Sequence, residues 1–205
     1  MWEGYLTAID EFIDKHDDVK ASPVVDRFHV AQNYRDDFDD LRKKELRGLK
    51  NDLSPEIYAE ECKGMLWILR KNHSSLDPDE RRALRRLFTH SPQLHQAYTF
   101  REELTAIFNQ NLSISGAERR LEAWIHKVEQ SSLDTFDGFI KTLRNHWKYI
   151  VNYFDQRISS GFVEGLNNKI KTITRRCYGI PKTVTLFQRI WLDLNGKERF
   201  SLSTT

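Results

Sequence analysis

Three dipeptides fix where helices begin, and they constrain the fold of this chain more than any other feature. Ser54-Pro55, Asp77-Pro78 and Ser91-Pro92 each place a capping side chain directly before a proline that suits the first turn of a helix. Behind these starts, apolar residues recur at spacings of three and four, the period of an amphipathic helix. The sequence therefore predicts a mainly α-helical protein.

The same periodicity extends to most of the remaining chain. It predicts helices over residues 2–15, from His29 onward, over about 115–130 and over about 133–157. The segment "PVV" before Asp26 is the one stretch that is short, β-branched and followed by a polar residue, as strands often are. We expect one short strand near Val24–Asp26.

The composition of the chain excludes several classes of protein and of site. Charged residues make up 30% of the chain but the formal net charge is only +2, so any basic patch must be local. A hydrophobic content of 39% is enough for a core, and no apolar run approaches the roughly 18 residues of a membrane span. Two cysteines, Cys62 and Cys177, form no disulfide framework or four-ligand zinc site, which suits a reducing cytoplasm.

One late segment, "SSGFVEGLNNKIKTITRRCYG" from Ser159 to Gly179, predicts a helix with two chemically different faces. At about 100° per residue, Asn168, Lys171 and Arg175 fall within about 40° of Glu164. Lys169 and Arg176 flank this row. The apolar residues gather on the opposite side of the helix: Val163, Leu166, Ile170, Ile173 and Cys177.

The alternative for this segment is an ordinary helix face that is exposed to solvent and has no binding role. Several of its residues favour binding to phosphate instead. The carboxylate of Glu164 comes at the helix start, where the helix dipole favours the ionised form. Asn167 and Asn168 are poor helix formers, which indicates a role other than helix stability. The basic residues behind them can each neutralise one backbone phosphate. A carboxylate beside them can hold the divalent ion that phosphoryl transfer uses.

A second segment, "VVDRFHVAQNY", places Asp26 at the end of the expected strand and His29 three residues later. By itself this spacing is typical of a helix cap followed by a helical histidine. Together with "GFVEGLNNKIKTITRRCYGI", however, it resembles the carboxy-terminal part of bacterial insertion-sequence transposases of the DDE type, in the ISL3 group. The resemblance covers essentially the whole chain, and the second box is its most specific part.

The resemblance implies a particular architecture. We expect the carboxy-terminal portion of a ribonuclease H-like α/β core, one short strand plus helices, interrupted by a long helical insertion. Residues 1–30 would be the partial core, residues 31–155 the insertion, and residues 156–205 the final catalytic helix and a carboxy-terminal helix.

The resemblance also implies a function, DNA transposition by metal-dependent cleavage and joining of strands. Glu164 would be the last acid of the catalytic triad and a metal ligand, and Asp26 and His29 match a D-x-x-H signature that accompanies the triad. The residues expected to hold DNA are Asn168, Lys169, Lys171, Arg175 and Arg176. The implied cofactor is Mg2+ or Mn2+, bound only by the complete triad. The implied partners are transposon-end and target DNA, and either further copies of this chain or a full-length transposase, with no membrane. The implied location is the bacterial cytoplasm, at the nucleoid.

One departure from the family pattern concerns catalysis. The two aspartates of the triad are expected upstream of Met1, and Asp10 and Asp14 lie inside an amphipathic pattern that matches neither. We therefore expect a chain that resembles a transposase without its front half and does not cleave DNA alone. Two alternatives stay open: a non-catalytic DNA-binding module that regulates full-length transposase, and a decayed product without a role.

Overall fold

The computed structural model of the protein describes residues 3–16, 18, 22–157, 161–177, 179 and 182–200. It divides into two compact units, Met1–Ile158 and Ser159–Thr205. Each is described by itself below. The predicted boundaries near residues 30 and 155 between core, insertion and catalytic helix stay predictions.

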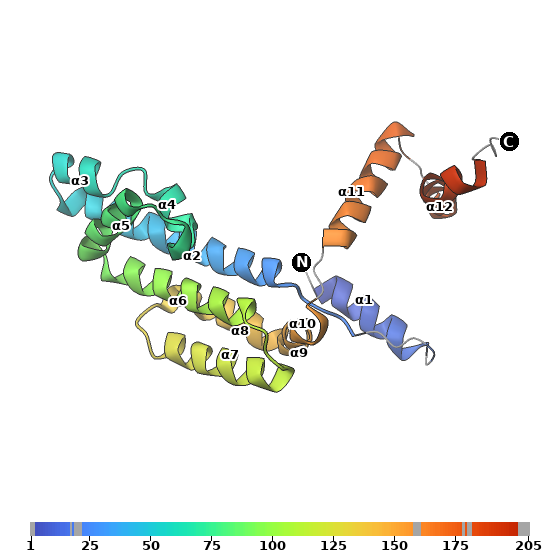
Figure 1. The fold of residues 1–205 in the computed structure, drawn as a ribbon, viewed down its shortest axis with the longest axis horizontal. Helices are drawn as coiled ribbons and strands as arrows, with labels where there is room; N and C mark the ends of the chain where they lie inside the picture. Colours follow the sequence, from blue (N-terminus) through green and yellow to red (C-terminus); the bar gives the residue numbers. More distant parts are fainter. Residues whose placement is uncertain are drawn as a thin grey trace. The chain divides into compact units, whose positions relative to one another are not determined.

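Helices make up nearly all of the first unit (Figure 1). In chain order they are α1 (Glu3–Asp14), α2 (Arg27–Asp52), α3 (Pro55–Glu61), α4 (Leu66–Arg70), η1 (His73–Ser75), α5 (Pro78–His90), α6 (Pro92–Asn109), α7 (Ile114–Glu129), η2 (Asp134–Phe136), α8 (Asp137–Asn145), α9 (Trp147–Val151) and α10 (Tyr153–Gln156). The prediction of a mainly helical protein is confirmed.

The three predicted cap-and-proline starts open α3, α5 and α6. The side chains of Ser54, Asp77 and Ser91 accept hydrogen bonds from backbone N–H groups in the first turn of their helices. At α5 the cap is reciprocal, because the side chain of Glu80 also accepts from the backbone N–H of Asp77 at 3.2 Å. These caps satisfy donors that a helix start otherwise leaves without partners.

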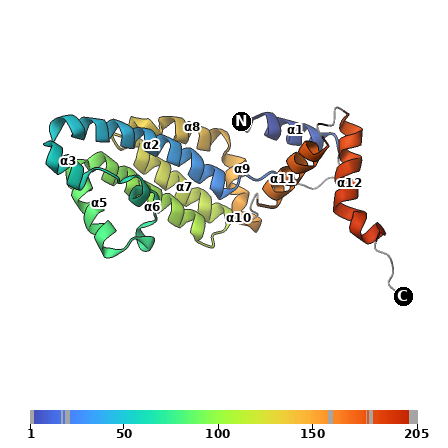
Figure 2. The ribbon, with the colours of Figure 1, turned by 90° about the horizontal axis from the view of Figure 1, so that it is seen from above.

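The core of this unit lies where α2, α6 and α7 pack together with η2 and α8, side by side in both views (Figures 1 and 2). Tyr34 of α2 stacks on Phe136, with 4.6 Å between ring centroids and 6° between ring planes. The hydroxyl of Tyr34 donates to the carbonyl of Ala97 at 2.7 Å, and burial raises the pKa of this hydroxyl well above its ordinary value. Trp124 of α7 donates to the carbonyl of Phe100 at 3.0 Å. The buried polar atoms of these two aromatic side chains are therefore satisfied.

The expected strand near Val24–Asp26 is wrong. The described residues contain no β-strand, and the backbone before α2 is extended but unpaired with any other extended segment. Instead, the N–H of Val25 donates to the carbonyl of Tyr149 at 2.9 Å, and Asn152 donates to the carbonyl of Pro23 at 2.9 Å. The backbone of this segment therefore hydrogen-bonds to residues at α9 and not to a neighbouring strand. For this reason its β-branched side chains do not produce a strand.

The helix predicted over about 133–157 is broken into η2, α8, α9 and α10. A break falls at His146, whose backbone N–H and ring Nδ1 both hydrogen-bond the carbonyl of Thr142. The last piece ends at Arg157, which has a positive φ of 52°. The later part of this stretch nevertheless belongs to the core, because Ile150, Tyr153 and Phe154 are buried.

The second unit consists of α11 (Gly161–Arg176) and α12 (Thr183–Phe200), which contact each other. Within the described part of the chain, no helix combines the length and the apolar character that a membrane crossing requires.

Candidate nucleic-acid interface

The helix predicted to carry Glu164 exists as α11, and Glu164 lies in its first turn. The side chain of Glu164 lies outside the described residues, as does that of Val163. The helix ends in two basic residues, Arg175 and Arg176, at the end where the helix dipole favours positive charge.

The two faces of α11 differ in exposure as the periodicity predicts. Ile173 is buried, with 4% of its surface exposed. The other described members of the apolar side are half-buried: Leu166, Ile170 and Cys177. The polar residues predicted to bind DNA, apart from Lys169, are exposed: Asn168, Lys171, Arg175 and Arg176. One side of the helix therefore packs and the other presents an amide and three cations to solvent.

Lys169 differs from the rest of this row. Its ammonium group lies 2.9 Å from the carboxylate of Asp193 on α12. The hydrogen bond from Lys169 lowers the pKa of the Asp193 carboxyl, helped by the positive charges of Arg176 and Arg189. Asp193 is therefore ionised at neutral pH and engages Lys169, whereas Lys171, Arg175 and Arg176 form no such ion pair among the described residues.

Asp26 and His29 lie at the start of α2. Asp26 is buried, and its side chain caps the helix by accepting from the backbone N–H of Phe28. His29 is half-buried, and its carbonyl accepts from the side chain of Asn33 at 2.9 Å. Both residues belong to the first unit and Glu164 belongs to the second, so the predicted proximity of the three stays a prediction.

The cap gives Asp26 a structural role that can be separated from any role of its charge. Replacing Asp26 with alanine should lower the free energy of unfolding by about 1 kcal/mol, because the first turn of α2 loses its acceptor. Asparagine caps as well as aspartate, so Asp26→Asn should retain most of the stability. Urea denaturation of the three proteins measures both changes. Equal losses for the two variants would show that the charge of Asp26, and not its cap, stabilises the fold.

The described side chains do not form a metal site. No group of three or more histidine, cysteine, aspartate and glutamate side chains lies close enough together to hold an ion in this part of the chain. His90 hydrogen-bonds Glu61 at 2.6 Å, a pair without a third ligand. Because the side chain of Glu164 lies outside the described residues, the predicted metal site stays a prediction.

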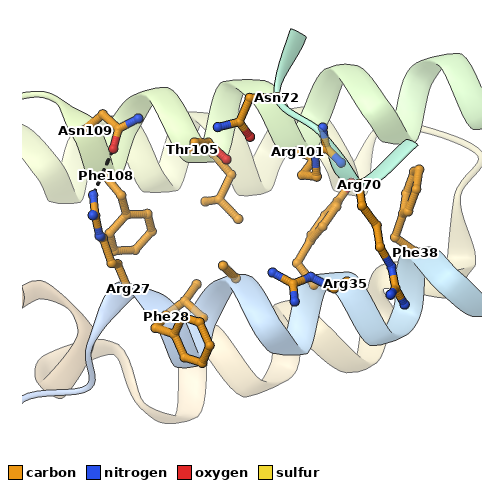
Figure 3. Close-up of a pocket in the computed structure, with 14 residues that line it drawn as sticks. Arg27, Phe28, Arg35, Phe38, Arg70, Asn72, Arg101, Thr105, Phe108 and Asn109 are labelled. Atoms are coloured by element: carbon orange, nitrogen blue, oxygen red, sulfur yellow. Dashed lines mark hydrogen bonds between the residues drawn. The ribbon is translucent and has the colours of Figure 1, made fainter. Parts of the chain in front are cut away.

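A groove between α2 and α6 was not predicted (Figure 3). It has a volume of about 270 Å³ and an apolar floor that includes Tyr34 and Phe108. Four arginines line it: Arg27, Arg35, Arg70 and Arg101. The first two stand eight residues apart on α2, at helical spacing, which is the signal in the sequence that could have marked this side of the helix.

Comparison with known proteins points to a single class. A family model described as a transposase, of the DDE type and ISL3 group, matches residues 1–190. The transposase for insertion sequence element IS1001 of Bordetella parapertussis is 27% identical over 181 residues, which are 88% of this chain and 44% of the relative. Transposases for IS1557 from two Mycobacterium tuberculosis strains, CDC 1551 / Oshkosh and H37Rv, are 27% identical over 140 residues, 67% of this chain and 31% of each relative. This chain therefore spans less than half the length of these relatives. No solved structure matches.

Proposed function

Because this chain belongs to the ISL3 family of DDE transposases, we propose that it acts on DNA in transposition and that α11 is its main contact with the DNA backbone. The observation that carries the proposal is the exposure of Lys171 and Arg175 on the side of α11 opposite the buried Ile173. The family match confirms the resemblance seen in the two sequence boxes.

The charges of α11 suit a phosphate backbone. Lys171, Arg175 and Arg176 occupy the last turns of the helix and are exposed, so each can reach a phosphate without first leaving a buried position. Asn168, one turn before Lys171, is an exposed amide that can donate to a phosphate or sugar oxygen. Lys169 contributes less, because Asp193 already engages it.

We assign Glu164 as the acid that this chain contributes to the DDE triad, on the match of "VEGLNNKIK" to the family's last box. DDE transposases generally use a divalent metal. We propose that Glu164 supplies one carboxylate of that metal site, as one member of the complete triad. Asp26 and His29 would support the core from the start of α2, where Asp26 is the cap.

The extended segment before α2 is consistent with the end of a ribonuclease H-like core. Its anchoring to the region of Tyr149 and Asn152 brings the two ends of the helical stretch together, as an insertion into a core requires. We propose on this ground that residues 31–155 form that insertion.

The proposal predicts a change in the salt dependence of DNA binding. Replacing Lys171 and Arg175 with alanine should reduce the slope of log K against log salt for duplex DNA by about 1.8, because each lost phosphate contact contributes about 0.9. Fluorescence anisotropy with a labelled duplex, titrated between roughly 50 and 200 mM salt, measures this slope.

The matched control removes the same two charges from another surface. Lys43 and Arg82 are exposed and ion-paired with Asp40 and Asp79 on α2 and α5. Their double alanine variant should keep the slope of the unmodified protein. If both double variants lowered the slope equally, α11 would contribute only to the overall charge of the protein and would not be a specific contact with DNA. Absence of duplex binding at 50 mM salt would overturn the proposal.

A further inference from the structure

The groove between α2 and α6 combines basic side chains with apolar ones. Seven polar side chains surround an apolar floor, and none of its lining residues is aspartate or glutamate. Its volume of about 270 Å³ lies just below the roughly 300 Å³ at which pockets for small organic ligands begin. The groove is therefore large enough for part of a small organic group and too small for a duplex.

Two of the four guanidinium groups are already neutralised. Arg70 lies 2.5 Å from the carboxylate of Asp39. Burial by itself would raise the pKa of that carboxyl, but hydrogen bonds from Arg70 and Arg42 outweigh it and lower the pKa, so the pair stays charged. Arg101 pairs with Glu102 at 2.8 Å and also donates to backbone carbonyls. These two arginines therefore line the groove but add little net positive charge to it.

The other two guanidinium groups have no acidic partner among the described residues. Arg27 donates to the neutral side chain of Asn109 at 2.9 Å, across the mouth of the groove (Figure 3). Arg35 is exposed and forms no hydrogen bond or ion pair within the described part of the chain. Two uncompensated positive charges therefore border one groove, which favours an anionic ligand.

The position of these two charges favours a strand over a free anion. Arg27 and Arg35 are eight residues apart on one helix, about 12 Å along its axis. Figure 3 shows their guanidinium groups well separated along the groove. Two groups this far apart cannot share one phosphate, so they suit two different phosphates of the same strand.

Phe28 adds a surface for a base. Phe28 is one of the residues that line the groove and is 54% exposed, although phenylalanine is usually buried. Exposed aromatic rings beside backbone-binding cations are the arrangement with which proteins bind single-stranded nucleic acid, because every base can stack on such a ring.

We propose that this groove binds a single strand of DNA, with Arg27 and Arg35 on its phosphates and a base on Phe28. The inference rests on the proposed function for the identity of the nucleic acid, and it adds a second contact in the helical bundle that is separate from α11. The DNA partner of α11 is a duplex, whereas the partner of the groove is an unpaired strand.

The test uses the full chain and two probes, a labelled oligothymidylate and a labelled duplex. Replacing Arg27 and Arg35 with alanine should weaken binding of the single strand and reduce its salt slope by about 1.4, at about 0.7 for each phosphate. Binding of the duplex should keep its slope. Phe28→Ala should weaken the single-strand complex about fivefold or more without changing the slope, because stacking releases no counterions.

Three controls decide the outcome. Circular dichroism confirms that each variant folds, and Arg35→Lys should retain the slope because it retains the charge. The double variant Arg82→Ala, Arg119→Ala removes two exposed arginines from other helices and should behave like the unmodified protein. Equal losses from this control pair, or displacement of the strand by inorganic phosphate at matched ionic strength, would overturn the inference.

Different results would contradict the groove inference and the assignment of α11 as the duplex contact. If Lys171→Ala, Arg175→Ala removes both duplex and single-strand binding while the groove variants change neither, the groove inference is wrong and the proposed function stands. If the groove variants lose only the single strand while duplex binding never depends on α11, the groove stands and the α11 assignment is wrong.

Discussion

Phe136→Ala should lower the free energy of unfolding by about 3 to 5 kcal/mol, a large fraction of the roughly 5 to 15 kcal/mol that stabilises a typical domain. Phe136 has 0% of its surface exposed and stacks on Tyr34 at 4.6 Å between ring centroids. Its ring lies where η2 meets α2, so its removal leaves a cavity between elements that are distant in sequence. Denaturation by guanidinium chloride, followed by tryptophan fluorescence, measures the loss.

The matched control is an aromatic residue that makes little contact. Trp67 is 69% exposed, and its ring faces Arg70 at 5.6 Å. Trp67→Ala should therefore cost no more than about 1 kcal/mol, the range of an exposed cation–π contact. Similar losses for the two variants would contradict the location of the core between α2, α6 and α7.

Local chemistry explains what the sequence predicts well. A cap needs one side chain and the first turn of its own helix, so the starts at Ser54, Asp77 and Ser91 are readable from adjacent residues. The two faces of α11 follow in the same way from spacing alone. Ile173 is buried and Lys171 exposed, as a period of 3.6 residues requires.

Contacts between distant residues explain what the sequence did not predict. Val24–Asp26 has the side chains of a strand, but its backbone pairs with the carbonyl of Tyr149, far along the chain. The groove is built in the same way. Arg27 meets Asn109 from another helix, and no pattern in either segment alone indicates that they face each other. The box that contains Asp26 and His29 drew attention to the acid and the histidine, whereas Arg27 and Phe28 between them line the groove.

Glu164→Gln should reduce strand cleavage at least about 100-fold in a complete transposase that contains this chain. A metal ion held by such a carboxylate stabilises the charge of the phosphoryl-transfer transition state by several kcal/mol. A loss of about 2.7 kcal/mol corresponds to a 100-fold lower rate. Glutamine keeps the size and the hydrogen-bonding capacity of the side chain but removes its charge. A suitable protein is a chimaera in which this chain replaces the matching stretch of the IS1001 transposase.

The control for that substitution is Glu122→Gln, which removes the same charge from an exposed position on α7. This variant should cleave at the rate of the parent chimaera. A loss as large as that of Glu164→Gln would mean that the chimaera responds to charge in general.

The most direct test measures two properties of the Glu164→Gln chimaera, its affinity for duplex DNA and its cleavage rate. Both are measured with one DNA substrate in the presence of Mg2+. We predict duplex affinity within about twofold of the parent, since the cations of α11 are unchanged, together with cleavage reduced at least about 100-fold. Retained cleavage would contradict the assignment of Glu164 as the triad acid. A parent chimaera that neither binds nor cleaves the DNA would contradict the proposal that this chain acts on DNA as part of a DDE transposase.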